Sequence, residues 1–296
     1  KLIVSLTSWH KRFNTLHLTL ECLLNQTIKA DKIILWIAET ERHLIPESVI
    51  SLGVNGIDIR YCEDIKSYKK IVPTLIEEPG SFIVTADDDL AYGPNWLEKI
   101  LSSWNGDYKT VVANRAHKIR LDKSNNPVAY KDWQWNYLES SDISNLIFPT
   151  TGYGVLYPPN CFHSDVLNTK LFEELSPNAD DIWLFWMCRL NGVKFKVVGE
   201  KETLREWKGT LDAGLWQTNL LKGDNDRYIK NMIAHYGFEA EKTDISCLTE
   251  ANIIDRNLPR QDLLAFHKSS QYWDDRYRLK GNSGAGSYGR LAEFKA

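Results

Sequence analysis

The sequence lacks the features of disulfide-bonded, membrane-spanning and nucleic-acid-binding proteins. Its five cysteines are odd in number, scattered and without a CxxC pair, so we expect them to be reduced core residues. No apolar run is long enough to span a bilayer, and no signal peptide precedes the first apolar segment. The formal net charge of -3 comes from interspersed acidic and basic residues, which provide no basic field for a nucleic acid. These absences predict a cytoplasmic protein without a nucleic acid partner.

Apolar and amphipathic segments alternate along the first two hundred residues. With 43% hydrophobic and 25% charged residues, the chain can bury the core of one large domain. The apolar runs predict strands at 2–6, 32–38, 57–62, 81–86, 110–113 and 193–198, and helical spacing predicts helices at 16–24, 68–75, 96–104 and 180–190. This alternation predicts a single α/β domain with a mostly parallel, Rossmann-like sheet flanked by helices. Its ligand site is expected at the carboxyl ends of the strands.

The composition changes near residue 268. Residues 269–296 contain a glycine and serine cluster, GNSGAGSYG, between charged and aromatic segments. We therefore expect a main domain over residues 1–268, followed by a linker or loop over residues 269–296.

Three consecutive aspartates, Asp87, Asp88 and Asp89, directly follow the apolar segment SFIVTA. Carboxylates this close repel one another unless a cation or hydrogen-bond donors neutralise them. Mg²⁺ or Mn²⁺ suits one or two carboxylates together with substrate phosphates, and it would offset charge on a departing nucleoside diphosphate. The alternative is a group of acids near the N-terminus of the helix that begins close to Pro94.

A second acidic pair, Asp180 and Asp181, opens the apolar helix predicted over residues 180–190. Transfer of a sugar to a hydroxyl with inversion needs one carboxylate to take the proton of that hydroxyl. A carboxylate at the rim of an apolar helix can have the raised pKa that suits this role. Asp181 is the candidate base, and the alternative for Asp180 is helix capping.

Tryptophan is abundant, and several of the 11 tryptophans have polar neighbours in the sequence, including Trp133, Trp135, Trp207 and Trp216. Sugar rings stack on indole faces, while the indole N–H meets hydroxyl groups. The alternative for each of them is a role as core filler.

An ordered set of motifs resembles bacterial GT-A glycosyltransferases of the family-two type, which act in surface-polysaccharide pathways such as O-antigen synthesis. The resemblance covers roughly residues 1–240. Its motifs are LIVSLTSWHKR, LHLTLECLLNQTIKADKIILW, DIKSYKK, VTADDDLAYGPNWL, TTGYGVLYPPN and ADDIWLFWMCRLNG. A DxD motif alone is weak evidence, whereas this ordered set is specific.

The resemblance implies a GT-A fold, a nucleotide-sugar donor with UDP as the expected nucleotide, and Mn²⁺ or Mg²⁺ as cofactor. It also implies a glycan or lipid-linked oligosaccharide acceptor, which would bring the protein to the inner face of the cytoplasmic membrane. The donor-binding residues that it implies are Thr7, Arg12, Glu39, Asp64, Lys69, Lys70, Asp87, Asp88 and Gly152. The implied metal ligands are Asp89 and Asp87, with His235 as a further ligand, and the implied catalytic acids are Asp181 and Asp180.

Each implied donor contact has a structural alternative. Arg12 and the two lysines would then be solvated surface charges, Glu39 and Asp64 loop caps, and Gly152 a turn residue. Asp180 stands where many relatives have glutamate, and the pair Asn225-Asp226 resembles a family feature whose role the sequence does not give.

The tail SSQYWDDRYRLKGNSGAGSYGRLAEFKA resembles the start of a class I SAM-dependent methyltransferase domain. The glycine-rich cofactor loop of such a domain is absent from the sequence, and no apolar strand precedes GAGSYG. We therefore expect a fragment of a longer transferase, and no methyl transfer by these residues.

The sequence as a whole predicts a metal-dependent glycosyltransferase that moves a sugar from a nucleotide-sugar to a hydroxyl, with inversion. A haloacid-dehalogenase-like phosphatase with Asp87 as nucleophile is a first alternative, but such enzymes carry the motif on an early strand, and here three predicted strands come first. A non-catalytic sugar- or nucleotide-binding module is the second alternative, and it would not need Asp181.

Overall fold

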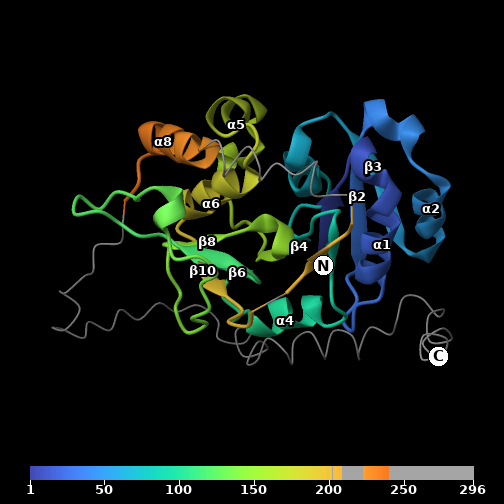
Figure 1. Cartoon of the computed structure of the whole chain (residues 1–296), viewed down its shortest axis with the longest axis horizontal. Coiled ribbons are helices and arrows are strands. Elements are labelled where there is room, and N and C mark those ends of the chain that lie inside the picture. Colours follow the sequence, from blue (N-terminus) through green and yellow to red (C-terminus); the bar gives the residue numbers. More distant parts are fainter. Residues whose placement is uncertain (202, 209–222, 240–296) are drawn as a thin grey trace, which may run out of the picture.

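The computed structural model describes residues 1–201, 203–208 and 223–239, which are built around a seven-stranded sheet (Figure 1). In chain order its strands are β1 (Leu2–Thr7), β2 (Lys32–Ala38), β3 (Ile57–Cys62), β4 (Phe82–Thr85), β6 (Thr110–Ala113), β9 (Val155–Tyr157) and β10 (Lys194–Val197). Their order across the sheet is β10-β6-β9-β4-β1-β2-β3. All neighbours are parallel except β9, which runs antiparallel to both β4 and β6. This topology confirms the predicted α/β class with a mostly parallel sheet.

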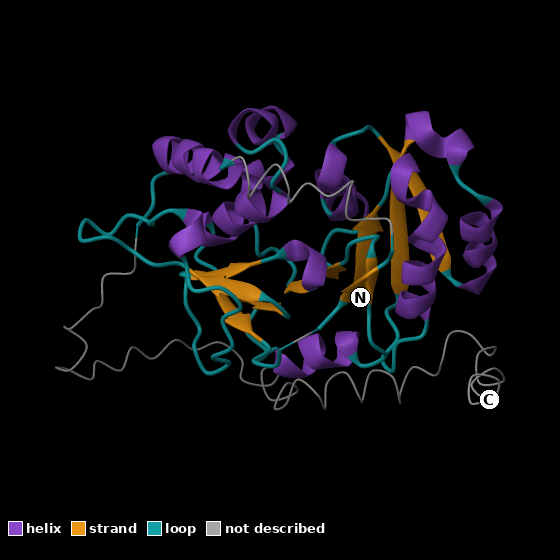
Figure 2. Ribbon diagram, in the orientation of Figure 1, coloured by secondary structure: helices purple, strands orange, loops and turns teal. Residues whose placement is uncertain are grey.

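Helices flank both faces of this sheet (Figure 2). The α-helices are α1 (Phe13–Leu24), α2 (Glu47–Ile50), α3 (Val72–Glu77), α4 (Trp96–Ser103), α5 (Thr169–Leu175), α6 (Asp180–Leu190) and α8 (Asp224–Tyr236). The 3-10 helices are η1 (His10–Arg12), η2 (Glu39–Leu44), η3 (Ser51–Asn55), η4 (Lys66–Lys70), η5 (Tyr130–Asp132), η6 (Thr151–Tyr153) and η7 (Ser164–Leu167).

Two hydrophobic cores lie on opposite faces of the sheet. Val112 of β6 and Leu156 of β9 join the core that contains α1 and α4, whereas their chain neighbours Val111 and Val155 join the core around α6. Successive strand residues point to opposite faces, so a strand covered on both sides needs an unbroken apolar run. This is the reason that continuous apolar segments such as KIILWIA are strands here.

Two small sheets extend the edge where the parallel strands end. β5 (Leu90–Ala91) follows the aspartate triplet and pairs antiparallel with β11 (Arg205–Glu206). β7 (Ala116–Lys118) follows β6 and pairs antiparallel with β8 (Ile147–Pro149). Because β1 to β4 and β6 are parallel, the segments that follow them gather at the same edge.

Three local features depart from the sequence expectation. The helix predicted over residues 68–75 is split into η4 and α3, with Pro73 in the first turn of α3. A short strand was expected within residues 150–159, but the antiparallel direction of β9 had no clear sequence signal, and neither had the helix α8. The domain boundary near residue 268, the methyltransferase-like segment 269–296 and Trp216 lie outside the described residues.

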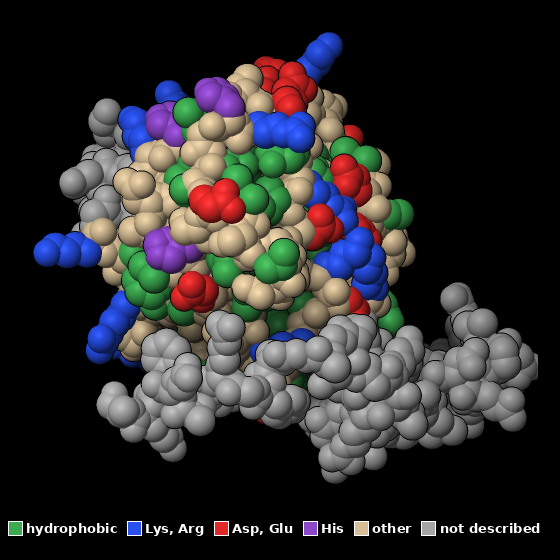
Figure 3. Space-filling view, turned by 90° about the vertical axis from the view of Figure 1, so that its right-hand side faces the viewer, with side chains coloured by type: hydrophobic (Ala, Val, Ile, Leu, Met, Phe, Trp, Pro, Cys, Tyr) green, Lys and Arg blue, Asp and Glu red, His purple; other side chains and the backbone are tan. Residues whose placement is uncertain are grey.

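Charges of both signs are mixed on the face that carries α2 and β3 (Figure 3). At the β3 edge, for example, Arg60 binds Asp58 at 2.6 Å and Glu77 at 2.8 Å. Within the described ranges, no helix has the length and apolar character needed to cross a membrane.

Candidate functional site

The aspartate triplet occupies the turn between β4 and β5. The Asp87 and Asp89 side chains are partly exposed, whereas Asp88 is only 3% exposed. The backbone N–H of Asp87 donates to the hydroxyl of buried Tyr92 at 2.7 Å, and the backbone of Asp89 accepts from Trp207 N at 3.0 Å. The turn therefore holds the carboxylates of Asp87 and Asp89 toward solvent and the carboxylate of Asp88 toward the protein interior.

Asp88 holds an arginine in place. It accepts hydrogen bonds from Ser8 Oγ and, at 2.6 Å, from Arg12 Nη1, and the same Arg12 nitrogen lies 3.0 Å from Asp89 Oδ2. Arg12 lies at the end of η1, directly after β1, so the first strand delivers this cation to the triplet. The structure thus assigns Asp88 to anchoring Arg12, and leaves Asp87 and Asp89 as the carboxylates with exposed surface.

Lys70 joins the two acidic clusters. Its buried ammonium donates to Asp87 Oδ1 at 2.6 Å and to Thr151 Oγ1 at 3.3 Å, and lies 3.2 Å from Asp180 Oδ2. Thr151 Oγ1 in turn donates to Asp180 at 3.1 Å. Burial alone would lower the pKa of Lys70, but Asp180 and Asp87 raise it above its ordinary value. A charged lysine therefore binds the triplet to the start of α6.

Gly152 leaves room for the Asp87 carboxylate. A Cβ atom at this position would lie 2.0 Å from Asp87 Oδ2, which is well inside the contact distance of real atoms. The carbonyl of Gly152 accepts from Tyr92 Oη at 2.6 Å, so the same tyrosine ties η6 to the triplet turn. Close approach of backbone to a functional group explains this glycine, rather than turn geometry alone.

Asp181 lies in the first turn of α6, beside Asp180. Its Oδ1 accepts from the N–H of Ile182 at 2.9 Å, and neither aspartate caps the helix, since the N-cap is Ala179. Burial, followed by repulsion from Asp180, raises the pKa of Asp181 to about 7. Asp181 therefore carries a carboxyl group poised to exchange a proton near neutral pH.

The pKa of Asp89 is raised for the same kind of reason as that of Asp181. Burial, with repulsion from Asp87 and Asp88, raises its pKa to about 7 despite the nearby Arg12. Burial is the first cause, and an excess of negative charge at this edge is the second, because five aspartates, with Glu206 adding to the repulsion, face three cations. The carboxylates are Asp87, Asp88, Asp89, Asp180 and Asp181, and the cations are Arg12, Lys70 and Arg115.

This charge excess and these donor types fit a hard divalent cation. Asp87 and Asp89 would hold Mg²⁺ or Mn²⁺ through oxygen atoms, and phosphate oxygens and water would complete the shell. In the part of the chain that the structure describes, no three histidine, cysteine or acidic side chains form a ready metal cage. Among the described residues, Asp87 and Asp89 would therefore share the ion with a ligand that brings its own oxygen atoms.

His235 stands apart from this group. It is exposed in the last turn of α8, where its ring packs edge-on against Tyr236 with centroids 4.4 Å apart. Tyr236 Oη donates to Asp165, and the neighbouring Gly237 carbonyl binds Trp186 in the second half of α6. Across the described residues no contact links His235 to the triplet, so the predicted ligands Asp87, Asp89 and His235 do not form one group.

The other predicted donor residues line the same sheet edge without touching the triplet. Thr7 Oγ1 donates to the Trp36 carbonyl at 2.8 Å, Glu39 forms a 3.4 Å ion pair with Arg42, and Lys69 pairs with Asp64. Glu39 and Asp64 are well exposed, with side chains 61% and 57% accessible. They follow β2 and β3 and extend the edge away from the acidic clusters.

Arg115 is a site residue that the sequence reasoning missed. Its Nε donates to Thr150 Oγ1 at 2.8 Å, and its guanidinium lies 3.7 Å above the Tyr153 ring. It interacts electrostatically with Asp87, and its Nη atoms make no hydrogen bond to another described group. Its sequence signal was available, because it follows the buried strand β6 at the edge where the other site residues gather.

The tryptophans singled out from the sequence have different roles. Trp133 is buried and donates to the Val128 carbonyl, and Trp207 Nε1 donates to Thr19 Oγ1 at 2.8 Å beside the triplet turn. Trp135 is 40% exposed. Of these three, Trp135 therefore has the most ring surface open to solvent.

The sequence matches no protein-family model and no curated protein. Several solved structures show a remote similarity to its fold. One is glucosyl-3-phosphoglycerate synthase from Mycobacterium tuberculosis in complex with Mn²⁺, UDP and glucosyl-3-phosphoglycerate, with 11% identity, 81% of each chain covered and a TM-score of 0.44. Another is S. aureus TarS 1-349 in complex with UDP-GlcNAc, with 12% identity, 81% of this chain and 68% of that chain covered, and a TM-score of 0.48. A third is the inositol-1-phosphate CTP transferase from T. maritima, with 14% identity, coverage of 79% and 96%, and a TM-score of 0.42.

At this identity the likeness concerns the path of the chain alone. The donor, metal and acceptor of those proteins do not transfer with it. The chemistry of this chain therefore has to be argued from its own side chains.

Proposed function

We propose that this chain is a metal-dependent glycosyltransferase that moves a sugar from a UDP-sugar to a hydroxyl of a glycan acceptor, with inversion. The observation that carries the proposal is Lys70, which places Asp87 of the triplet and Asp180 of α6 on one ammonium group. The carboxylates suited to a metal and the carboxylate suited to a base therefore share one site, as the reaction requires.

The donor side of the site is built by the triplet and its cations. Asp89 and Asp87 would hold Mn²⁺ or Mg²⁺, which offsets charge on the departing diphosphate when it is bound. Lys70 keeps Asp87 ionised, and the pKa of Asp87 is lowered against the effect of its burial by Lys70 and Arg12. Arg115 has guanidinium nitrogens without a hydrogen-bond partner among the described residues, and it suits an anionic group of the donor.

The acceptor side is built by the first turn of α6. Asp181 takes the proton of the acceptor hydroxyl as the oxygen attacks the anomeric carbon of the donor sugar. The bond from that carbon to the diphosphate oxygen breaks, and UDP leaves with the bonding electron pair. A single displacement of this kind inverts the anomeric configuration. A base pKa near 7 suits this proton transfer at neutral pH.

A phosphatase that uses Asp87 as nucleophile is disfavoured by its surroundings. Asp87 Oδ1 accepts from Lys70, and Oδ2 lies so close to Gly152 that a single added methyl group would clash with it. A carboxylate that is ion-paired with a buried ammonium is a poor attacking group, whereas its second oxygen remains available to a cation.

The choice of UDP and of a glycan acceptor rests on the family resemblance of the sequence. That resemblance places the reaction in bacterial surface-polysaccharide synthesis, on a growing glycan or a lipid-linked oligosaccharide. We propose that the protein works at the cytoplasmic face of the membrane, where the acceptor would bring it.

The proposal is tested by measuring UDP release from UDP-glucose, UDP-galactose and UDP-N-acetylglucosamine, with Mn²⁺ and a panel of methyl glycosides as acceptors. We expect release with one donor, loss of release in EDTA, and a reduction of about 10²-fold or more in Asp181→Asn, which is the range for a removed general base. Normal UDP release by Asp181→Asn would contradict the assigned base. Hydrolysis of p-nitrophenyl phosphate that Asp87→Asn abolishes would instead favour the phosphatase.

A further inference from the structure

An aromatic group is formed by His117 of β7 and by Tyr130 and Trp135 in the segment that follows it. Tyr130 in η5 is buried, and its ring packs edge-on against Trp135 with centroids 5.4 Å apart. The Trp135 ring also lies against His117, with centroids 4.5 Å apart and planes tilted by 36°. Because Trp135 is nevertheless 40% exposed, it presents ring surface to solvent while one side is supported.

Ring contacts connect this group to the helix that carries Asp181. Tyr130 packs edge-on against Phe148 of β8 at 6.0 Å, and Phe148 packs against Phe185 of α6 at 5.1 Å. Phe185 is four residues after Asp181, so the two side chains share one side of the helix. The Tyr130 hydroxyl and the Asp181 carboxylate also interact electrostatically, which adds to the effect of burial in raising the pKa of Tyr130.

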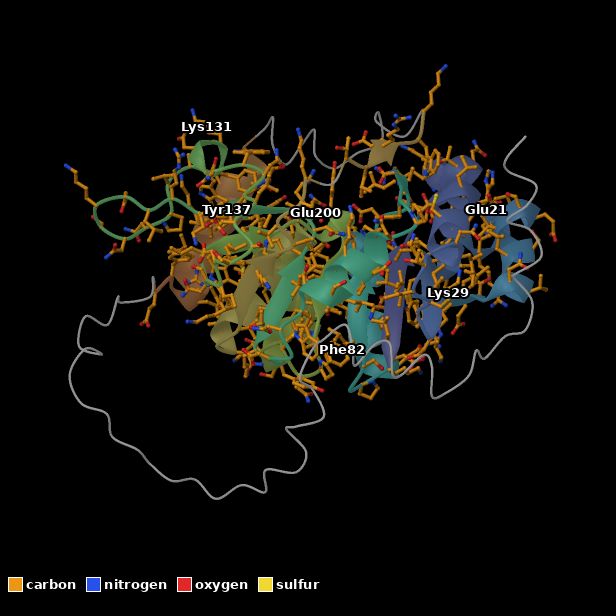
Figure 4. The ribbon with its side chains drawn as sticks, turned by 90° about the horizontal axis from the view of Figure 1, so that it is seen from below. Glu21, Lys29, Phe82, Lys131, Tyr137 and Glu200 are labelled. Atoms are coloured by element: carbon orange, nitrogen blue, oxygen red, sulfur yellow. The ribbon has the colours of Figure 1, made fainter. Side chains whose placement is uncertain are left out.

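The aromatic group is held rigidly by its neighbours. Asp226 of α8 accepts the backbone N–H of Tyr130 at 2.7 Å, and Lys118 and Gln134 exchange two backbone hydrogen bonds of 2.9 Å. Figure 4 shows Lys131 and Tyr137, at the two ends of this stretch, on the side of the molecule where α8 lies. The ring nitrogen of His117 accepts from Asn136 N at 3.2 Å, and burial, with Arg115 nearby, lowers the His117 pKa to about 3. The supporting imidazole is thus uncharged at neutral pH.

We propose that the exposed face of Trp135, supported by His117 and Tyr130, is the subsite on which a pyranose ring of the acceptor stacks. This inference rests on the proposed function, and it names an uncharged sugar ring as the group that the acceptor presents. The C–H face of a pyranose is apolar, as is the face of an indole, while the hydroxyls at its rim remain free for hydrogen bonds. A ring fixed before binding also lowers the entropy cost of holding a weakly bound sugar.

The same geometry gives Asp226 a role as a positioning residue. It touches no reacting group, but it fixes the backbone of Tyr130 from the first turn of α8. Its only contribution to sugar binding would be the placement of the aromatic group. An asparagine retains the accepting side-chain oxygen, so it should preserve that placement where alanine does not.

The test is saturation-transfer NMR on the full chain with methyl glycosides of glucose, galactose, mannose and N-acetylglucosamine, in the presence of UDP and Mn²⁺. We expect transfer to the ring C–H protons of at least one sugar, retained in Trp135→Phe. Affinity should fall about five- to tenfold in Trp135→Ala, as for the loss of one stacking contact. Asp226→Ala should also weaken binding, and Asp226→Asn should restore it.

The matched control is Tyr108→Ala, which removes a 45% exposed aromatic ring packed against Phe82, at the start of β4 and thus at the opposite edge of the sheet. It should bind the sugar as the wild type does. Unchanged binding by folded Trp135→Ala, or no transfer to any sugar from the wild type, would overturn the proposal. UDP binding is measured by calorimetry on the same samples. Its presence without sugar binding would overturn only the sugar subsite, whereas sugar binding without any UDP binding would count against the proposed function.

Discussion

At the residue scale, the site depends on a contact between a carboxylate and a glycine. Asp87 can bind Lys70 and keep its second oxygen available only because Gly152 has no side chain. In the sequence, Gly152 is only one of two glycines in TTGYG, and Asp87, the residue whose carboxylate requires it, lies 65 residues earlier in the chain. Contacts of this kind are set by tertiary packing, so local patterns do not reveal them.

Gly152→Ala should abolish metal-supported UDP binding. The new methyl group would meet Asp87 Oδ2 at 2.0 Å, so either the carboxylate or η6 has to move. A stability loss of about 1–3 kcal/mol, typical of overpacking, is expected alongside. Calorimetry with UDP and Mn²⁺ measures the first effect and urea unfolding the second. Gly53→Ala is the control, since a Cβ there meets nothing within 4 Å. Normal UDP binding by Gly152→Ala would refute this account of the glycine.

Asp181 should give the reaction a pH dependence. The base acts only as a carboxylate, so the rate of UDP release should rise as pH increases through about 7 and level off above it. A profile that stays flat from pH 5.5 to 8.5, with chemistry rate-limiting, would argue against Asp181 as the base.

Ionisation of Asp181 should increase the rate of UDP release but decrease the stability of the folded protein. A carboxyl whose pKa is raised in the folded state binds its proton more tightly there than in the unfolded state. The stability that this group contributes to the folded protein is therefore fully present below the unfolded pKa of about 4, and it is lost as pH rises through about 7. Asp181→Asn should therefore raise the melting temperature at pH 8 by about 2–4 °C or more, and raise it by clearly less at pH 5, where only part of the contribution has been lost. Equal melting temperatures of the two proteins at pH 8 would contradict the raised pKa.

At the scale of elements, the short helix η4 connects β4 with α6. Lys70 at its end binds Asp87 after β4 and Asp180 in the first turn of α6, while Tyr68 donates to the Ser176 carbonyl at 2.6 Å just before α6. The motif DIKSYKK therefore supplies structure as well as charge. The sequence pointed to Lys69 and Lys70 alike, and only the fold separates the lysine of the site from the one that pairs with Asp64.

Lys70→Met should destabilise the protein far more than Lys69→Met. Removing the buried ammonium leaves buried Asp180 and partly buried Asp87 without their partner, which costs about 3–5 kcal/mol. Lys69 is equally buried, but its partner Asp64 is mostly exposed and can be solvated when the lysine is lost. Urea unfolding of both variants measures the difference. Similar losses for the two would show that Lys70 does not couple the acidic clusters energetically.

Most of the core elements were predictable because they carry strong local patterns. The buried strands β1, β2 and β4 are unbroken apolar runs, and the amphipathic helix α1 ends where Asn25 follows its last apolar residue. The strand β9 is only three residues long, and its direction is set by β4 and β6 on either side. No pattern within three residues contains that information.

At the scale of the whole molecule, the parallel sheet collects at one edge residues that lie far apart in the chain. Arg12, Lys70, Asp87 and Arg115 follow β1, β3, β4 and β6, and Asp180 arrives at the same place with α6. The sequence indicated Asp87 because it follows an apolar strand and Asp180 because it opens an apolar helix, whereas Arg12 and Lys70 were expected from the family resemblance. The sequence did not predict that Asp88 anchors Arg12, nor that Arg115 and Tyr130 stand beside the acids, since those contacts depend on how the segments meet.

Calorimetric titration of UDP with and without Mn²⁺, on the wild type and on Asp89→Ala, tests whether this edge of the sheet is a metal-dependent nucleotide-sugar site, as we propose. Asp89 is the partly exposed acid whose pKa of about 7 reflects its burial and its repulsion by Asp87 and Asp88, which a bound cation would relieve. We predict tight UDP binding by the wild type only when Mn²⁺ is present, and at least about tenfold weaker binding by Asp89→Ala. UDP binding that is unaffected by Mn²⁺ and by the mutation, or no UDP binding under any condition, would contradict it.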